Sequence, residues 1–235
     1  MKRGYVAQDA GSIRRMFSQI AARYDLANAC LSGGLDGWWR LYVARLLACW
    51  QPRNILDLAT GSGALAATLR RTLPGAQLVG ADFCAPLLAR SRRRGLENLV
   101  VADALALPFR DAVFDAVTVA FGLRNMASYD EALLEMRRVL APEGHVVILD
   151  FSLPQGPLLP LYRLYLHHVL PRLAGWLTGV PEAYTYLAES IEQFPRGRRM
   201  LQLLERTGFV DAGFRPLSGG IVSVYAARRG KTVTG

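Results

Sequence analysis

The sequence predicts an α/β fold: a doubly wound, mostly parallel β-sheet of seven strands with helices on both faces. Two observations lead to it. From position 53 onward, apolar strand-like runs alternate with runs of helical periodicity. At the end of the chain, two strand-like runs are separated by Ser218-Gly219-Gly220, a pattern typical of an antiparallel hairpin. With 235 residues, 51% of them hydrophobic, the chain can bury one full core.

The first 52 residues predict an N-terminal helical leader that belongs to the same domain. A helix is predicted over Asp9–Ala22, where the apolar residues recur at i, i+3, i+4 and i+7. A second apolar helix is predicted over Trp38–Cys49, ended by Gln51-Pro52. Periodicity leaves two roles open for this leader: it covers a ligand cleft, or it only buries a sheet edge.

Residues 53–235 form the predicted core, with a helical insertion at about 155–195. The strand-like runs are Asn54–Leu58, Gln77–Ala81, Leu99–Ala102, Phe114–Ala120, His145–Phe151, Phe209–Arg215 and Ile221–Ala227. The helix-like runs are Ala64–Leu73, Pro86–Arg94, Tyr129–Leu140, Leu158–Leu177, Tyr184–Phe194 and Arg196–Thr207. Doubly wound sheets bind their ligands at the carboxyl ends of the strands.

The composition favours three kinds of binding partner but does not select one of them. A net charge of +9 suits RNA, an anionic membrane surface or an acidic ligand. The three cysteines have no Cys-x-x-Cys spacing, so neither a disulfide framework nor a zinc site is encoded, and a reducing cytosol fits. The three histidines have no acid or cysteine at ligand spacing, so no metal is expected. We see neither a secretory signal nor an apolar run long enough to span a bilayer.

The turn after the first strand predicts a ligand site. Thr60-Gly61-Ser62-Gly63 separates that strand from a helix, and a ligand can lie against bare backbone where no Cβ intrudes. A glycine pair of this kind is also common as a plain turn. Asp82 follows Gly61 by 21 residues, at the end of the second strand, where a Rossmann-like fold binds the two hydroxyls of a ribose. Asp103 follows the third strand and is placed to accept from an adenine amino group.

The same turn argues against a nucleotide with phosphates. The third glycine of a dinucleotide motif is missing, because Gly63 is followed by Ala64-Leu65-Ala66. No Gly-x-x-x-x-Gly-Lys phosphate loop is present either. A ligand that carries ribose and adenine without phosphate fits better, and S-adenosylmethionine is the common one.

Several segments resemble the successive motifs of a class I methyltransferase. They are Leu56–Gly63, Gly80–Phe83, Asp103–Phe109, Phe114–Val117 and Arg138–Gly144. Ala120-Phe121-Gly122-Leu123-Arg124-Asn125 resembles the Phe-Gly-Leu-Arg-Asn signature of the C-methyltransferases of ubiquinone and menaquinone biosynthesis. The leader and the tail also resemble that family, so the resemblance covers roughly residues 13–228.

The resemblance implies a Rossmann-like class I methyltransferase fold with an antiparallel C-terminal strand, and it implies roles for individual residues. The implied S-adenosylmethionine contacts are Thr60, Gly61, Ser62, Gly63, Asp82, Phe83, Asp103, Ala104 and Ala120. The implied catalytic residues are Arg124 for the developing phenolate, Asn125 for the quinol, and Asp150, Tyr24 and Tyr186 as proton acceptors. Packing or a loop-closing salt bridge would also explain the tyrosines and Arg124.

The implied reaction is methylation of a ring carbon of a polyprenyl hydroquinone, with a naphthoquinol or a benzoquinol as the ring. The implied partners are the quinol, a membrane surface and either a homo-oligomer or a quinone-biosynthesis complex, and nucleic acid is not expected. The implied location is the cytoplasm, with or without peripheral contact at the inner face of the membrane. Three alternatives stay open: another lipophilic acceptor, an RNA substrate, and a scaffold that binds the cofactor without catalysis.

Two positions depart from the family's usual pattern. Ala64 stands where the family usually has an acidic residue after the glycine turn. The resemblance implies that this chain lacks a carboxylate contact near the sulfonium or the amino group of S-adenosylmethionine. Asp150 stands where the family has a longer glutamate, so the carboxylate is kept but is shorter.

Overall fold

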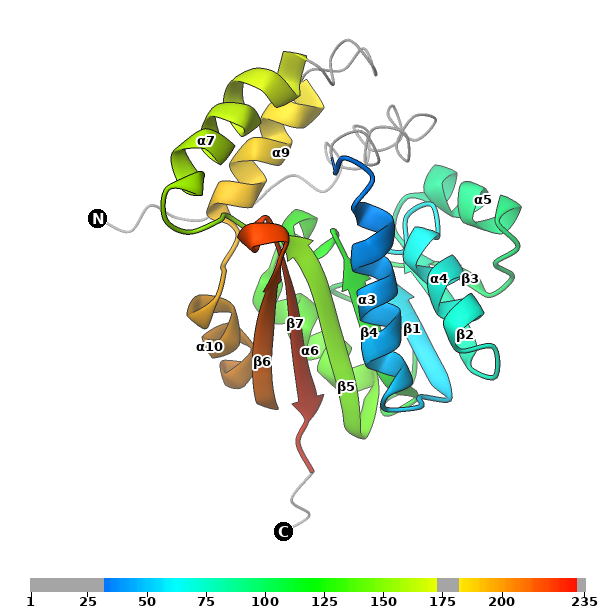
Figure 1. Ribbon diagram of the computed structural model, residues 1–235. Coiled ribbons are helices and arrows are strands. Elements are labelled where there is room, and N and C mark those ends of the chain that lie inside the picture. Colours follow the sequence, from blue (N-terminus) through cyan, green and yellow to red (C-terminus); the bar gives the residue numbers. More distant parts are fainter. Residues whose placement is uncertain (1–31, 173–181, 232–235) are drawn as a thin grey trace.

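The computed structural model describes residues 32–172 and 182–231, with side chains given for residue 186 onward in the second range (Figure 1). It contains one sheet of seven strands in the order β3-β2-β1-β4-β5-β7-β6. The predicted α/β class and the mostly parallel sheet are therefore confirmed. The predicted helix over Asp9–Ala22 and the catalytic candidate Tyr24 lie outside the described residues.

The parallel strands follow from near-continuous apolar runs that are buried on both faces. They are β1 (Asn54–Leu58), β2 (Gln77–Asp82), β3 (Leu99–Val101), β4 (Phe114–Ala120) and β5 (Leu140–Phe151). The C-terminal pair, β6 (Phe209–Leu217) and β7 (Val222–Arg229), is antiparallel, as the glycine turn between them predicts. β7 is inserted between β5 and β6 and runs antiparallel to both.

Two layers of helices cover the sheet. On one face, α3 (Asp36–Ala48) and α4 (Ala64–Thr72) pack against β1, β4 and β5, with Trp39 and Leu69 in that core. On the other face, α6 (Tyr129–Val139) and α10 (Arg198–Arg206) pack their buried Met136 and Leu204 against the sheet. The helix α5 (Ala85–Arg93) follows β2 and contacts β2 and β3.

The fifth strand begins five residues before the predicted His145. Leu140 already pairs with Phe114 of β4, and the register then shifts before Ala116 pairs with His145. Glu143 takes a left-handed φ of 67° inside this irregularity, so the Pro-Glu-Gly segment that follows α6 is accommodated as a bulge within the strand.

A helical cap lies over the carboxyl ends of the central strands. It consists of α7 (Leu158–Leu164), the π-helical turn η3 (Tyr165–Val169) and α9 (Glu182–Gln193), which lie together above the sheet in Figure 1. Its inner residues Leu166, Leu170 and Ile191 form a separate apolar cluster with Cys84 and Leu87, which follow β2. The cap therefore packs onto the edge of the sheet where ligands are expected. None of the described helices is long and apolar enough to cross a bilayer.

Candidate active site

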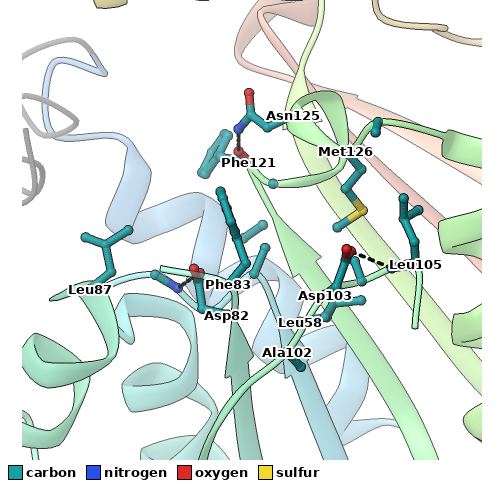
Figure 2. A pocket seen from close by; sticks show the side chains of 16 residues that line it. Leu58, Asp82, Phe83, Leu87, Ala102, Asp103, Leu105, Phe121, Asn125 and Met126 are labelled. Atoms are coloured by element: carbon teal, nitrogen blue, oxygen red, sulfur yellow. Dashed lines mark hydrogen bonds between the residues drawn. The ribbon is translucent and has the colours of Figure 1, made fainter. Parts of the chain in front are cut away.

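A pocket opens at the carboxyl ends of β1 to β4 and encloses about 840 Å³, its open mouth included (Figure 2). Its walls are mainly apolar, with two carboxylates and one amide among them. The residues of the wall that the sequence singled out are Gly61, Asp82, Phe83, Asp103, Ala104, Ala120 and Asn125. Residues from four separate segments of the chain thus meet in one cavity.

Asp82 is the buried carboxylate of this pocket and is 4% exposed. One carboxylate oxygen accepts the Gly61 N–H at 2.8 Å, and the other accepts the Cys84 N–H at 2.8 Å. Burial raises the pKa of Asp82, while these two N–H donors oppose the shift. Each oxygen keeps further lone pairs, so Asp82 ties β2 to the glycine turn and can still accept from a ligand.

Asp103 lies at the neighbouring strand end and is exposed to solvent. Its Oδ1 accepts the Leu105 N–H at 2.9 Å, which closes a tight turn after β3. Figure 2 shows Asp82 and Asp103 at neighbouring strand ends, both below Phe121 and Asn125 in this view. Neither acid caps a helix: α5 begins after Cys84, and the next helical turn after Asp103 is η2 (Leu123–Asn125).

Three of the predicted cofactor residues are in the turn but not in the wall. The Thr60 hydroxyl donates to Asp57 at 2.6 Å, and the Ser62 hydroxyl accepts from Arg94 at 3.2 Å. Gly63 takes φ +80°, and a Cβ there would lie 2.4 Å from a Leu96 methyl group. These residues shape the turn, and of its residues only Ala59 and Gly61 reach the pocket.

The loop after β4 forms the opposite wall in a strained conformation. Phe121 and Ala59 both take left-handed φ angles, of 58° and 53°. A Cβ on Gly122 would lie 2.5 Å from the Ala59 Cβ, so only glycine lets these two strand ends approach each other. Strain of this kind persists where the surrounding packing fixes the backbone, as it does at binding sites.

Arg124 and Asp150 form a buried ion pair behind this loop. The Arg124 Nη1 donates to the Asp150 carboxylate and to the Phe121 carbonyl, both at 2.7 Å, and the two side chains are 6% and 0% exposed. Burial raises the pKa of Asp150, and the Arg124 guanidinium opposes the shift. The Arg124 Nε is buried and has no hydrogen-bond acceptor within the described chain. The loop-closing salt bridge that the sequence left open for Arg124 is therefore present. Neither Arg124 nor Asp150 is part of the pocket wall.

Asn125 connects the wall to the helical cap. Its side-chain amide donates to the Phe121 carbonyl at 3.4 Å, and its Oδ1 accepts the Tyr186 hydroxyl of α9 at 3.1 Å. Figure 2 shows Asn125 above Phe121, on the far side of the pocket from Asp103. The structure thus brings together two of the predicted catalytic residues, Asn125 in the pocket wall and Tyr186 in the cap.

Several wall residues are not among the sequence-predicted site residues. They are Leu58, Ala59, Leu87, Ala102, Leu105, Phe121, Gly122, Met126 and Ala127. Phe121 and Gly122 belong to the Phe-Gly-Leu-Arg-Asn segment, which could have indicated them. The aliphatic side chains carry no chemical signal in the sequence, and only the folding of the loops shows that they face the cavity.

Asp57 is a further buried acid that the sequence analysis did not select. It is 1% exposed on β1, and its carboxylate accepts the hydroxyls of Thr60 at 2.6 Å and Thr118 at 2.7 Å. Burial raises its pKa from 3.8 to about 6, and the charge of Asp82 adds to the shift. The two hydroxyl donors and the more distant Arg40 oppose it.

Asp57 therefore predicts how stability depends on pH. The folded protein holds the Asp57 proton more tightly than the unfolded chain does, so this contribution is fully present below pH 3.8 and is lost as the pH rises to about 6. The loss should amount to about 2–3 kcal/mol. Asp57→Asn should remove this slope in urea unfolding measured from pH 4 to pH 7. Equal slopes in both proteins would contradict the assignment.

Solved structures with a similar architecture define the class of the fold. A possible histamine N-methyltransferase from Thermotoga maritima matches with a TM-score of 0.66 and 16% identity, over 92% of this chain and 99% of that one. Human N-acetylserotonin methyltransferase in complex with SAM matches with a TM-score of 0.65 and 19% identity, over 93% of this chain and 59% of that one. The fold is that of the class I S-adenosylmethionine-dependent methyltransferases.

The sequence narrows the class further. The model of the ubiE/COQ5 methyltransferase family matches residues 5–229, so the chain belongs to this family and is an S-adenosylmethionine-dependent methyltransferase. It is 47% identical over 220 residues to a demethylmenaquinone methyltransferase of Thermus thermophilus, covering 91% of this chain and all of that protein. It is 43% identical to a demethylmenaquinone methyltransferase of Deinococcus radiodurans, over 93% of each chain.

The described residues fit this methyl donor and give no support for a metal. Gly61 offers bare backbone beside the buried Asp82, and the apolar wall beyond Asp103 suits an uncharged purine. Within residues 32–172 and 182–231, no three His, Cys, Asp or Glu side chains are grouped as metal ligands would be.

Proposed function

We propose that this enzyme methylates a ring carbon of demethylmenaquinol, a polyprenyl naphthoquinol, in menaquinone biosynthesis. The observation that carries the proposal is the hydrogen bond between Asn125, a polar residue in the mainly apolar pocket wall, and Tyr186, which belongs to the cap with its apolar inner cluster. A hydroquinone with a long hydrocarbon tail has the matching chemistry of two hydroxyls on an apolar body. The two relatives described above carry the name of this activity.

The proposed arrangement places the cofactor along the strand ends. Asp82 accepts from the ribose hydroxyls, and Asp103 with Ala104 borders the adenine. The glycine turn lies along the amino-acid portion, with Phe83 and Ala120 as apolar walls and Thr60, Ser62 and Gly63 holding its shape. When bound, S-adenosylmethionine supplies an electrophilic methyl group on its sulfonium.

The chain's own residues would then position the quinol and stabilise its charge. The amide of Asn125 holds a quinol hydroxyl, with Tyr186 fixing that amide from the cap. Loss of a phenolic proton raises the electron density at the ring carbon that is methylated. The positive charge of the buried Arg124 guanidinium stabilises the resulting phenolate. Its Nε is a buried donor without an acceptor in the described chain, which supports this role. Asp150, with its raised pKa, and Tyr186 remain our candidates for accepting the proton, together with Tyr24.

Turnover with labelled S-adenosylmethionine tests the proposal directly. We expect label in the quinol when a short-chain demethylmenaquinol is supplied, and much less with the corresponding benzoquinol. Equal or faster labelling of the benzoquinol would move the substrate to the ubiquinone ring. Labelling of an unrelated lipophilic phenol or of RNA, with none of either quinol, would overturn the proposal. Cofactor binding without transfer to any acceptor would favour a non-catalytic scaffold.

Tyr186→Phe tests the contact between the cap and the pocket. The change keeps the ring and removes one neutral hydrogen bond, worth about 0.5–1.5 kcal/mol, so kcat/KM for the quinol should fall about three- to tenfold. The dissociation constant of S-adenosylmethionine should stay unchanged. Tyr42→Phe, in α3 outside the pocket wall, is the matched control. An unaltered kcat/KM in Tyr186→Phe would refute the role of this bond.

The proposal also places the enzyme in the cytoplasm, in peripheral contact with the membrane that holds its substrate. A polyprenyl tail partitions into the bilayer, so the pocket must reach the quinol from the membrane surface. We include a homo-oligomer or a complex with other quinone-biosynthesis enzymes as a further expectation.

A further inference from the structure

The outer face of the cap carries an exposed apolar stripe. Leu158, Leu161, Leu164 and Val169, here called the leucine stripe, are 52%, 64%, 54% and 48% exposed. Their helix already buries its opposite face, with Leu166 and Leu170 packed into the cap's own core. Large aliphatic side chains exposed along one helix face indicate a surface that is covered by something else.

A basic cavity adjoins this stripe. It lies between the end of α9, the start of α10 and the turn η4 (Ser218–Gly220), and it encloses about 1800 Å³, open solvent included. Three arginines line it, Arg196, Arg198 and Arg199. None of the three forms a salt bridge with an acid of the described chain. We call this cavity the arginine pocket.

The stripe and the pocket are continuous. Gln155, three residues before α7, lines the pocket, and a Cβ on Gly219 would lie 3.8 Å from the Leu158 side chain. In Figure 1, α7 and the start of α10 lie toward the same side of the molecule. Glu192 is the acid in the wall of the arginine pocket, and its Oε1 lies 3.3 Å from Arg163 Nε and from His167 Nε2. Its carboxylate therefore pairs with side chains of the cap and not with the three arginines of the pocket.

We propose that the leucine stripe and the arginine pocket form a docking surface for an anionic lipid bilayer, with a phospholipid phosphate in the arginine pocket. This inference rests on the proposed function, because docking would bring the active-site pocket to a quinol that is held in the bilayer. Leucines enter the boundary between headgroups and acyl chains, and arginines bind phosphate with paired N–H donors.

The charges and apolar side chains of this surface favour a bilayer over a second copy of the chain or an RNA strand. A second copy of the chain would bring the same three arginines to the interface, where like charges repel. An RNA strand would meet the arginines but leave four aliphatic side chains against a polar backbone. A bilayer with anionic headgroups satisfies both parts, because its surface potential attracts each basic side chain with about 1 kcal/mol.

Sedimentation with vesicles tests the surface without any turnover. The full-length protein should bind vesicles of phosphatidylglycerol mixed with phosphatidylcholine at least about tenfold more tightly than vesicles of phosphatidylcholine alone. The double variant Leu161→Asp, Leu164→Asp should lose about tenfold or more of this binding. Leu134→Asp, at a leucine 50% exposed on α6, is its matched control and should bind as the wild type does.

The arginine pocket has its own pair of variants. Arg198→Ala with Arg199→Ala should lower binding to the anionic vesicles about tenfold or more and remove most of the preference for them. Arg92→Ala with Arg93→Ala, two exposed arginines at the end of α5, removes the same charge elsewhere and should change binding less than about threefold.

Four results would overturn the inference. They are equal binding to the two kinds of vesicle, wild-type binding by the leucine variant, a leucine-dependent dimer in size-exclusion chromatography without vesicle binding, and calorimetric binding of inorganic phosphate or RNA without vesicle binding. Methyl transfer to a short-chain quinol in vesicle-free solution should be unchanged in all of these variants. If that transfer is absent from the wild type while vesicle binding is as expected, the proposed function fails and the docking surface stands.

Discussion

Replacing Asp82 with Asn should weaken S-adenosylmethionine binding about 100- to 1,000-fold in calorimetry. The carboxylate accepts from the Gly61 and Cys84 N–H groups and retains lone pairs that face the pocket. Asparagine offers one acceptor oxygen, and its amide would face an N–H donor or a ribose hydroxyl. A hydrogen bond to a charged acceptor contributes about 1.5–3 kcal/mol. Asparagine keeps one acceptor oxygen, so the two bonds to the ribose are weakened and not both lost, and a total of about 3–4 kcal/mol corresponds to the expected change in affinity.

Asp115→Asn is a close control for this change. Asp115 also accepts two backbone N–H groups, those of Arg53 at 2.9 Å and Asn54 at 2.8 Å, but it is not part of the pocket wall. Both variants should lose some stability in urea unfolding, and only Asp82→Asn should lose the cofactor. An unchanged dissociation constant in a folded Asp82→Asn protein would refute the ribose contact.

Replacing Arg124 with Met should lower the free energy of unfolding by about 3–5 kcal/mol. The change leaves the Asp150 carboxylate, which is 0% exposed, without its partner. The Phe121 carbonyl also loses the shorter of its two hydrogen bonds, the one from Arg124, at a residue that already has a left-handed backbone. Urea unfolding near neutral pH measures the loss, because Asp150 must then either stay charged without a partner or take up a proton.

Two further variants make this result specific. Arg206→Met breaks the exposed pair with Asp130, whose side chains are 62% and 49% exposed, and should cost less than about 1 kcal/mol. Adding Asp150→Asn to Arg124→Met should recover much of the loss, because no unpaired charge is then buried. A double variant no more stable than the single one would show that packing, and not the charge pair, explains the effect.

The sequence predicted the sheet well because its signals are local. Apolar runs such as Asn54–Leu58 and Phe114–Ala120 match β1 and β4 residue for residue. The start of β5 was predicted five residues late, because its Pro-Glu-Gly segment is accommodated as a bulge opposite β4. A bulge depends on the partner strand, and pairing between strands is not encoded in either segment alone.

The pocket was predictable only in part. Asp82, Asp103 and Asn125 carry polar groups at recognisable spacings, and the structure places all three in the wall. Arg124 has an equally strong motif, yet it lies behind the wall, bound to a residue 26 positions away. A motif identifies which loop matters, whereas the direction of each side chain depends on the backbone angles of Phe121 and on the room left by Gly122.

The sequence by itself determined the fold class, the family, the methyl donor and the loops that meet at the strand ends, since each follows from periodicity or from a contiguous motif. The tertiary structure alone decided that Arg124 and Asp150 form a buried ion pair, that Tyr186 reaches Asn125 from the cap, and that the leucine stripe adjoins the arginine pocket. The physical reason is distance along the chain. These contacts join residues 26 to 61 positions apart, and only the packing of whole elements brings them together.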